Sequence, residues 1–253
     1  MAEPPVESDP RWLTLKRHTP ARIGLARAGA GLATRDHLRF QRDHARARDA
    51  VHDRLDAAPL LDGLRERGLE ALHLLSAAAD RRAYLARPDL GRKLAPAARD
   101  SLDGRPHGFD LVLVLADGLS ARAVQQHALP LLDALLPALR AGGWRLGPAA
   151  VVEQGRVAIG DEIGEALGAG LVVVLIGERP GLSSPTSLGA YLTWAPRRGR
   201  VDAERNCISN IHPDGLGYAE AARKLLYLLA EARRRKLTGV DLKDESALLP
   251  PPG

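Results

Sequence analysis

Short apolar runs alternate with stretches of helical periodicity from residue 70 onward. This alternation is typical of a mostly parallel sheet that is covered by helices on both faces. Because aromatic residues make up only 4% of the chain, the interior must consist mainly of Leu, Val, Ile and Ala, which suits strands packed between helices. We therefore predict a Rossmann-like, doubly wound α/β fold with strands at 71–75, 111–116, 149–153, 171–176 and 191–194.

The segments between these strands carry the helices of the predicted fold. Residues 218–235 (YAEAARKLLYLLAEARRR) place apolar side chains on one stripe and end in three arginines, which interact favourably with the helix dipole. The other expected helices lie at 79–85, 95–102, 120–139 and 161–167.

The N-terminal part of the chain has a different pattern. Residues 34–55 are polar, with scattered Leu, Phe and Val and no internal Gly or Pro, as expected of an amphipathic helix with Thr34 as its N-cap. A glycine-rich loop at 20–33 precedes this helix. We predict two parts, a helical arm at 1–58 and an α/β domain at 59–253.

Composition and charge narrow the class of protein. The chain is 45% hydrophobic and 26% charged, which is typical of a packed globular protein and not of a disordered one. Its net charge is +5, but residues 1–60 carry 11 basic and 8 acidic side chains, so the most Arg-rich stretch is still a mixed surface. The charge pattern therefore does not predict a nucleic-acid partner.

Cys207 is the only cysteine, which excludes an intramolecular disulfide and any metal site built from several thiolates. A reducing compartment fits this cysteine usage. Residues 1–30 contain charges throughout, and the longest apolar runs are far shorter than a membrane span. We expect a cytoplasmic protein with no membrane contact.

The predicted fold also indicates where a ligand would bind. In open α/β sheets, ligands lie beyond the carboxyl ends of the strands, near the point where the strand order reverses. Three loops therefore matter most, at 154–159, 177–185 and 195–215. Glu178 directly follows the apolar run LVVVLIG and projects from this position. Two interpretations of this carboxylate stay open: it contacts a ligand, or it forms a salt bridge within the loop.

Two short patterns resemble known motifs only in part. Gly29-Ala30-Gly31 resembles the start of a dinucleotide-binding loop, but Thr34 stands where the third glycine belongs and no apolar strand precedes it. We interpret this stretch as a lead-in to the next helix.

The segment from Asp117 to Arg122 lies between a strand and a helix, as a hydrolase nucleophile elbow would, but Arg122 breaks the G-x-S-x-G pattern. Ser120 as a helix N-cap explains the same residues without catalysis. Asp117 remains a candidate for ordering a loop or contacting a ligand.

Cys207 and His212 form a further candidate pair. A thiolate beside a base could act as a nucleophile, while the default for a lone cysteine is a small buried hydrophobe. Asn210, His212 and Gly215 also fit the cobalamin motif D-x-H-x-x-G, except that Asn replaces the carboxylate that would orient the histidine. We interpret this second match as a coincidence.

Several longer motifs, in a fixed order from about residue 11 to the last helix, resemble the small subunit family of bacterial ethanolamine ammonia-lyase. They are far more specific than the short patterns above. The motifs are RAG at 27–29, YLARPDLGRKL at 84–94, ADGLSARAV at 116–124, QGRVAIGDEIGEALGA at 154–169, GERPGLSSPTSLGAYLTWAPR at 177–197 and ERNCISNIHPDG at 204–215.

The resemblance implies a hetero-oligomer of several large and small subunits, in which a TIM-barrel large subunit holds the substrate and the catalytic residues. Adenosylcobalamin would lie between the subunits and supply the adenosyl radical that converts ethanolamine to acetaldehyde and ammonia. The small subunit would contribute no catalytic side chain and no metal ligand, and its helical arm would contact the large subunit. Matched by motif, its cofactor contacts are Val157, Glu178 and Cys207.

Other interpretations of the residues stay open at this point. A stand-alone nucleotide-binding α/β enzyme, such as an oxidoreductase, would use Gly29–Gly31 or Asp117 for its ligand, and a basic RNA-binding protein is a second alternative. Only about ten residues precede the shared region, whereas some relatives carry a longer extension. Free cytoplasm and a bacterial microcompartment are therefore both open as locations.

Overall fold

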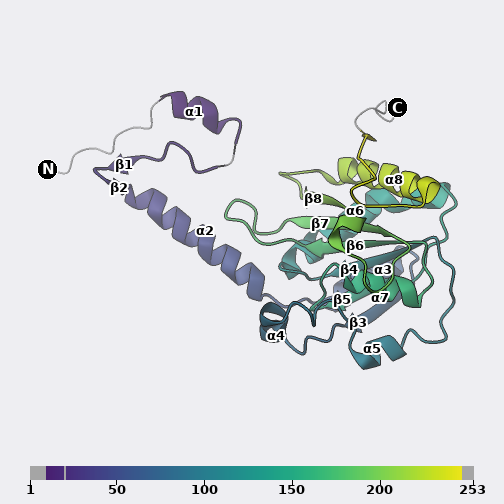
Figure 1. Ribbon diagram of the computed structural model, residues 1–253. Helices are drawn as coiled ribbons and strands as arrows, with labels where there is room; N and C mark the ends of the chain where they lie inside the picture. The colour runs from purple at the N-terminus through teal and green to yellow at the C-terminus, as the bar shows by residue number, and fades with distance from the viewer. Residues whose placement is uncertain (1–9, 20, 247–253) are drawn as a thin grey trace.

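The computed structural model describes residues 10–19 and 21–246, and it contains a six-stranded mixed sheet (Figure 1). The strand order is β3-β5-β4-β6-β7-β8. The first four strands in this order are parallel, and β7 and β8 are antiparallel to their neighbours. The predicted α/β class with a mostly parallel sheet is confirmed. The strands are β3 (Ala71–Leu75), β4 (Leu111–Ala116), β5 (Ala149–Glu153), β6 (Leu171–Gly177), β7 (Leu188–Trp194) and β8 (Arg205–Ile211).

Helices cover both faces of the sheet because the central strands are apolar on both faces. In β4, Leu111, Leu113 and Leu115 enter one core cluster, and the alternate residues enter the other. The first cluster includes residues of α3 (Ala57–Glu66), α6 (Ala121–Ala141) and α8 (Tyr218–Arg235), and the second includes residues of α5 (Pro96–Asp100) and α7 (Ile159–Ala166).

The C-terminal half of the sheet differs from the prediction. β7 begins at Leu188 and not at residue 191, and β8 occupies the middle of the segment that we expected to be a loop at 195–215. β8 is an edge strand with the sequence RNCISNI, in which only Arg205, Ile208 and Ile211 are buried. Asn, which occurs twice in this segment, is depleted in strands, so the pairing with β7 outweighs the segment's own propensity.

The predicted helices lie where expected, but most of their end residues differ from the prediction. α8 spans the predicted residues, while α4 (Arg81–Ala86), α5, α6 and α7 differ by one or two residues at most ends. α3 was not predicted. Thr34 as N-cap is wrong: the cap residue is Ala33, which makes no side-chain capping bond, and Thr34 is already the first helical residue.

The N-terminal part forms an arm that leads away from the sheet (Figure 1). It consists of α1 (Pro10–Lys16), a hairpin of β1 (Arg27–Ala28) and β2 (Gly31–Leu32), and the 19-residue α2 (Thr34–His52). Gly29 has a φ of +61°, so it serves the hairpin turn and not a dinucleotide loop between a strand and a helix. The boundary that we predicted between residues 58 and 59 falls near the start of α3. Within the described residues, no helix is long and apolar enough to cross a membrane.

Candidate functional site

A cavity of about 500 Å³ lies where the loops after β4, β5 and β6 meet. Val157 and Glu178, two of the three predicted cofactor contacts, line it. This is the position at which open α/β sheets bind ligands. The remaining lining residues are Tyr84, Arg92, Gly118, Leu119, Arg156, Ala158, Ile176, Gly177, Arg179, Tyr191 and Asp202.

Two glycines let the loop after β4 approach β6 at this cavity. The Leu119 amide donates to the Gly177 carbonyl at 2.9 Å. A Cβ atom on Gly177 would lie 2.0 Å from the Ser120 carbonyl oxygen, and one on Gly118, whose φ is +55°, would lie 2.3 Å from the Gly177 oxygen. The cavity floor therefore requires glycine at both positions.

The Glu178 carboxylate is held in place by donors on one of its two oxygens. Ser187 Oγ donates to Oε2, and the backbone N–H of Asn210 donates to the same oxygen at 3.1 Å. The Glu178 amide in turn donates to the Ser187 carbonyl at 2.9 Å. Among the described residues, Oε1 has no recorded hydrogen-bond partner, so this oxygen can accept a hydrogen bond from a ligand in the cavity.

The loop that carries Val157 is fixed by a stack of two guanidinium groups on Tyr84. Arg156 lies over one side of the ring at 4.4 Å from its centroid and donates to the Tyr84 carbonyl at 3.1 Å, and Arg81 lies 4.7 Å from the centroid. The Arg156 amide also donates to the Gly91 carbonyl at 2.8 Å. Burial raises the pKa of Tyr84 to about 12, so the phenol is neutral at physiological pH. Val157 is half-buried beside this stack.

Cys207, the third predicted contact, lies beside the cavity on β8. It is exposed and pairs in register with Tyr191, whose side chain lines the cavity. Although the residue as a whole is exposed, neighbouring groups shield its thiol from water, and this desolvation raises the pKa of Cys207 above its ordinary value; a hydrogen bond with Tyr191 partly offsets the rise. Cys207 is therefore a neutral thiol at physiological pH and lacks the thiolate that a nucleophile needs.

His212 does not act as a base for this thiol. Its Nε2 lies 2.9 Å from Asn210 Oδ1 and 3.3 Å from Ser184 Oγ, and the described residues show no contact between His212 and Cys207. The candidate catalytic pair is therefore not assembled. The segment around His212 instead supports Glu178, because Asn210 donates its amide to that carboxylate.

Asp117 lies at the end of β4 and orders the neighbouring loop. It is fully buried, accepts a hydrogen bond from the Gly155 amide at 2.9 Å and lies 3.4 Å from Arg81 Nη1. It does not line the cavity. Ser120 caps α6, as predicted, because its Oγ accepts from the Ala123 amide, and it also donates to the Pro185 carbonyl at 3.2 Å.

Burial of Asp117 makes the stability of the fold depend on pH. Burial raises the pKa of Asp117 from an ordinary 3.8 to about 6, so the folded state binds the proton more tightly than the unfolded state. The resulting stabilisation is full below pH 3.8 and is lost as pH rises through 6. We expect Asp117→Asn to remove this dependence. The free energies of unfolding of wild type and variant, measured at pH 4 to 7, should diverge in favour of wild type as pH falls, and parallel curves would contradict the prediction.

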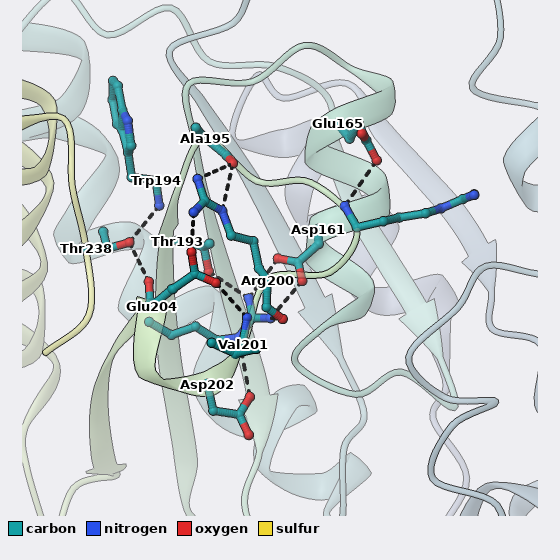
Figure 2. A network of polar contacts seen from close by, with 12 residues as sticks. Asp161, Glu165, Thr193, Trp194, Ala195, Arg200, Val201, Asp202, Glu204 and Thr238 are labelled. Carbon is teal, nitrogen blue, oxygen red and sulfur yellow. Dashed lines mark hydrogen bonds and ion pairs between the residues drawn. The ribbon is translucent and has the colours of Figure 1, made fainter.

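A polar network holds the segment that supplies Asp202 to the cavity (Figure 2). The buried Arg205 makes two parallel hydrogen bonds to Asp161, each at 2.7 Å, and a third to Thr193 Oγ1 at 3.0 Å. Arg200 donates to the Ala195 carbonyl at 3.0 Å, and its own carbonyl accepts from Arg205 at 3.1 Å. The network connects α7, β7 and the start of β8.

Sequence reasoning missed several residues of the cavity. Tyr84, Arg92 and Arg156 were within quoted motifs but were not singled out, and Tyr191 and Asp202 were assigned only to a strand and a loop. The one available signal was the density of Arg and Tyr in the motif at 84–94. Which of these side chains reach the sheet edge depends on the packing of α4 and the segment after it against the loop at 154–158.

Comparison with known proteins identifies the family. The model of the family "Ethanolamine ammonia-lyase light chain (EutC)" matches residues 9–243. The ethanolamine ammonia-lyase small subunit of Azotobacter vinelandii is 63% identical over 239 residues, which cover 93% of this chain and 88% of the relative. Those of Pseudomonas aeruginosa (57% over 247 residues, 96% and 90% covered) and Ralstonia nicotianae (59% over 237 residues, 92% and 88% covered) are similarly close. The chain therefore belongs to the ethanolamine ammonia-lyase light chain family, whose members are small subunits of a lyase.

Proposed function

We propose that this chain is the small subunit of an adenosylcobalamin-dependent ethanolamine ammonia-lyase, and that the cavity at the sheet edge forms one wall of the cobalamin site. The large subunit, a TIM barrel, supplies the other wall, the substrate site and the catalytic residues. The observation that carries the proposal is that two of the three contacts implied by the family motifs, Val157 and Glu178, line one cavity, while the third, Cys207, pairs on β8 with the cavity residue Tyr191.

The residues of the cavity fit the periphery of a corrin ring. That periphery carries primary amides, which donate through N–H and accept through C=O, separated by methyl groups. Glu178 Oε1 offers an acceptor, Arg156 and Arg92 offer guanidinium donors, and Val157 offers apolar contact. A cavity of about 500 Å³ is in the range for drug-sized ligands, so a corrinoid would extend beyond it and need a second wall.

When bound, the cofactor supplies a carbon radical by homolysis of its cobalt–carbon bond. The residues of this chain hold the corrin and exclude water from it. The Tyr84 stack fixes the loop of Val157, and Ser187 and Asn210 fix the carboxylate of Glu178, so contacts within this chain hold the wall in shape. A rigid, dry wall protects a radical from water and from competing hydrogen donors.

The arm supports the assignment of a partner subunit. Of the 19 residues of α2, only Ala50 is buried. The arm exposes large apolar side chains on α1, β2 and α2, and exposed apolar surface of this kind is typical of protein–protein contacts. We therefore infer that the arm contacts the large subunit, in a hetero-oligomer of several large and small subunits. The exposed residues are Trp12, Leu15, Leu32, Leu38 and Phe40.

The test compares the isolated chain with the chain co-expressed with its large subunit. The isolated chain should bind cobalamin weakly and release no acetaldehyde from ethanolamine, because one wall of the cofactor site and all catalytic residues are missing. Co-assembly should restore adenosylcobalamin-dependent acetaldehyde release. Deamination by the purified chain alone, or a failure of the two chains to associate, would refute the proposal.

A further inference from the structure

A second cavity, of about 540 Å³, lies between the arm and the loop that joins β6 to β7. Its lining comes from the segment after α1, from α2, and from residues 182–185 of that loop. The lining residues are Lys16, Thr19, Ala21, Arg22, Leu25, Ala26, Arg35, Asp36, Arg39, Arg42, Asp43, Arg46, Leu182, Ser183 and Pro185. This cavity has no lining residue in common with the proposed cofactor site. Residues of the loop that begins at Glu178 nevertheless line both cavities.

Four arginines of α2 form one stripe along this cavity. Their spacing is i, i+4, i+7 and i+11, which places them on one face of an α-helix. α2 contains five arginines, and the fifth, Arg48, lies nine positions from Arg39 and so faces the opposite side. We call the four residues Arg35, Arg39, Arg42 and Arg46 the basic stripe.

The charge of the basic stripe is only partly neutralised within the chain. Arg42 and Arg22 both pair with Asp43, at 3.0 and 2.6 Å, and Arg35 lies 3.9 Å from Asp36. Arg39 and Arg46 are exposed and have no ion pair among the described residues.

The cavity lining has six basic and two acidic side chains, a net charge of +4. Like charges at i,i+4 and i,i+3 spacing destabilise a helix. An anionic partner would relieve this repulsion, and α2, which packs little against its own domain, has room for one.

The surroundings of the stripe fit a protein segment better than a nucleic acid. Asp36 and Asp43 stand among the arginines and would repel a continuous phosphate backbone, while an acidic peptide can place its carboxylates singly. The cavity also contains an apolar strip of Leu25, Leu182 and Pro185, which suits the side chains of a peptide.

Resting on the proposed function, we propose that the basic stripe docks an acidic segment of the large subunit. The docked segment would lie between α2 and residues 182–185, so it would order the loop whose first residue, Glu178, faces the cofactor cavity. Association of the subunits would therefore weaken as salt concentration rises, because the contact is between charges at a surface.

The experiment measures the affinity of the full chain for the large subunit at low and high salt. Arg39→Glu and Arg46→Glu should each raise Kd by on the order of tenfold at low salt, because each variant sets a carboxylate against the acidic segment. Arg39→Gln, which removes the charge without reversing it, should give a smaller rise in the same direction. In about 1 M salt the differences should nearly vanish.

Arg48→Glu is the matched control. It makes the same change of charge in the same helix, at a side chain that is 70% exposed and on the opposite face, so Kd should stay near the wild-type value. Helix content by circular dichroism checks that every variant folds.

The outcomes separate the two proposals. No association of the wild-type chains defeats the proposed function. Wild-type association with unchanged Kd for Arg39→Glu and Arg46→Glu defeats only the docking proposal. An equal loss of affinity for Arg48→Glu defeats the assignment of the face. RNA binding by the wild-type chain that Arg39→Glu and Arg46→Glu abolish, with subunit affinity unchanged, would overturn the docking proposal in favour of a nucleic-acid partner.

Discussion

Replacing Arg205 by methionine is expected to lower the free energy of unfolding by about 3 to 5 kcal/mol, the typical cost of breaking a buried ion pair from one side. Arg205 and Asp161 have side chains only 2% and 3% exposed, and they make two parallel hydrogen bonds. Methionine keeps most of the volume but leaves the Asp161 carboxylate buried without its cation. Burial already raises the pKa of Asp161 while Arg205 opposes the rise, so the variant carboxyl will take up a proton more readily.

Replacing both partners tests whether the pair itself, or the unpaired charge, sets the cost. The double variant Arg205→Met with Asp161→Leu should recover most of the lost stability, because a buried ion pair is often no better than apolar packing of similar volume. The recovery should be incomplete, since Thr193 Oγ1 and the Arg200 carbonyl each lose a donor.

Urea unfolding of the full chain measures these differences, with Arg234→Met as the matched control. Arg234 pairs with Glu231 on the surface and its side chain is 69% exposed, so its loss should lower the free energy of unfolding far less than the loss of Arg205. Equal destabilisation by Arg205→Met and Arg234→Met would contradict the prediction, because it would show that the buried pair between α7 and β8 contributes no more to stability than a surface pair.

The central strands could be predicted because burial on both faces leaves a clear pattern. β4 and β6 are continuous apolar runs, and all their residues are buried. β8 could not be predicted, because it is an edge strand with only two aliphatic residues, Ile208 and Ile211, and because its strand state depends on pairing with β7. α3 was not predicted for a related reason. Its own sequence includes a proline and a glycine, and the packing that stabilises it against the sheet is a tertiary contact.

Part of the candidate site could likewise be predicted from the sequence, and part could not. The positions of Glu178 and Val157 follow from the rule that ligands bind beyond the carboxyl ends of parallel strands, so a sequence that predicts the strands also predicts these loops. The support of the loops does not follow from any local pattern. Arg81 and Tyr84 come from α4, and they meet Arg156 only because α4 packs at the sheet edge. Asn210 supports Glu178 across 32 positions of sequence.

The short patterns reflect local backbone structure and not a ligand site. Gly29 adopts a positive φ in the turn of the β1–β2 hairpin and Gly31 lies in β2, so the match to a dinucleotide loop reflects this hairpin and not a ligand. Asp117 is fully engaged with its own chain, through Gly155 and Arg81. The hairpin glycines and Asp117 therefore give no support to a stand-alone nucleotide-binding enzyme.

Glu178 offers the sharpest test of the cofactor wall, and the structure changes which variant is informative. Glu178→Ala removes the acceptor for Ser187 Oγ and for the Asn210 amide, so it disturbs the loop as well as any ligand contact. Glu178→Gln can keep its amide oxygen toward these two donors and present an NH₂ group where Oε1 stood. If Oε1 accepts a hydrogen bond from a corrin amide, this exchange sets donor against donor.

We expect both Glu178 variants to weaken adenosylcobalamin binding by the assembled enzyme, at a cost of about 1 to 3 kcal/mol for a donor left unpaired in a buried interface. This range corresponds to roughly a 5-fold to 150-fold rise in apparent Kd. Only Glu178→Ala should also lower the melting temperature. Saturating cofactor should restore much of the turnover, because the proposed function places Glu178 against the cofactor and not against the substrate. Ser187→Ala, which removes a loop donor and leaves Oε1 in place, is the control and should affect melting more than affinity. Titration of each assembled variant with adenosylcobalamin, beside its melting curve, separates the two roles: wild-type affinity for Glu178→Gln would show that the carboxylate serves the loop alone.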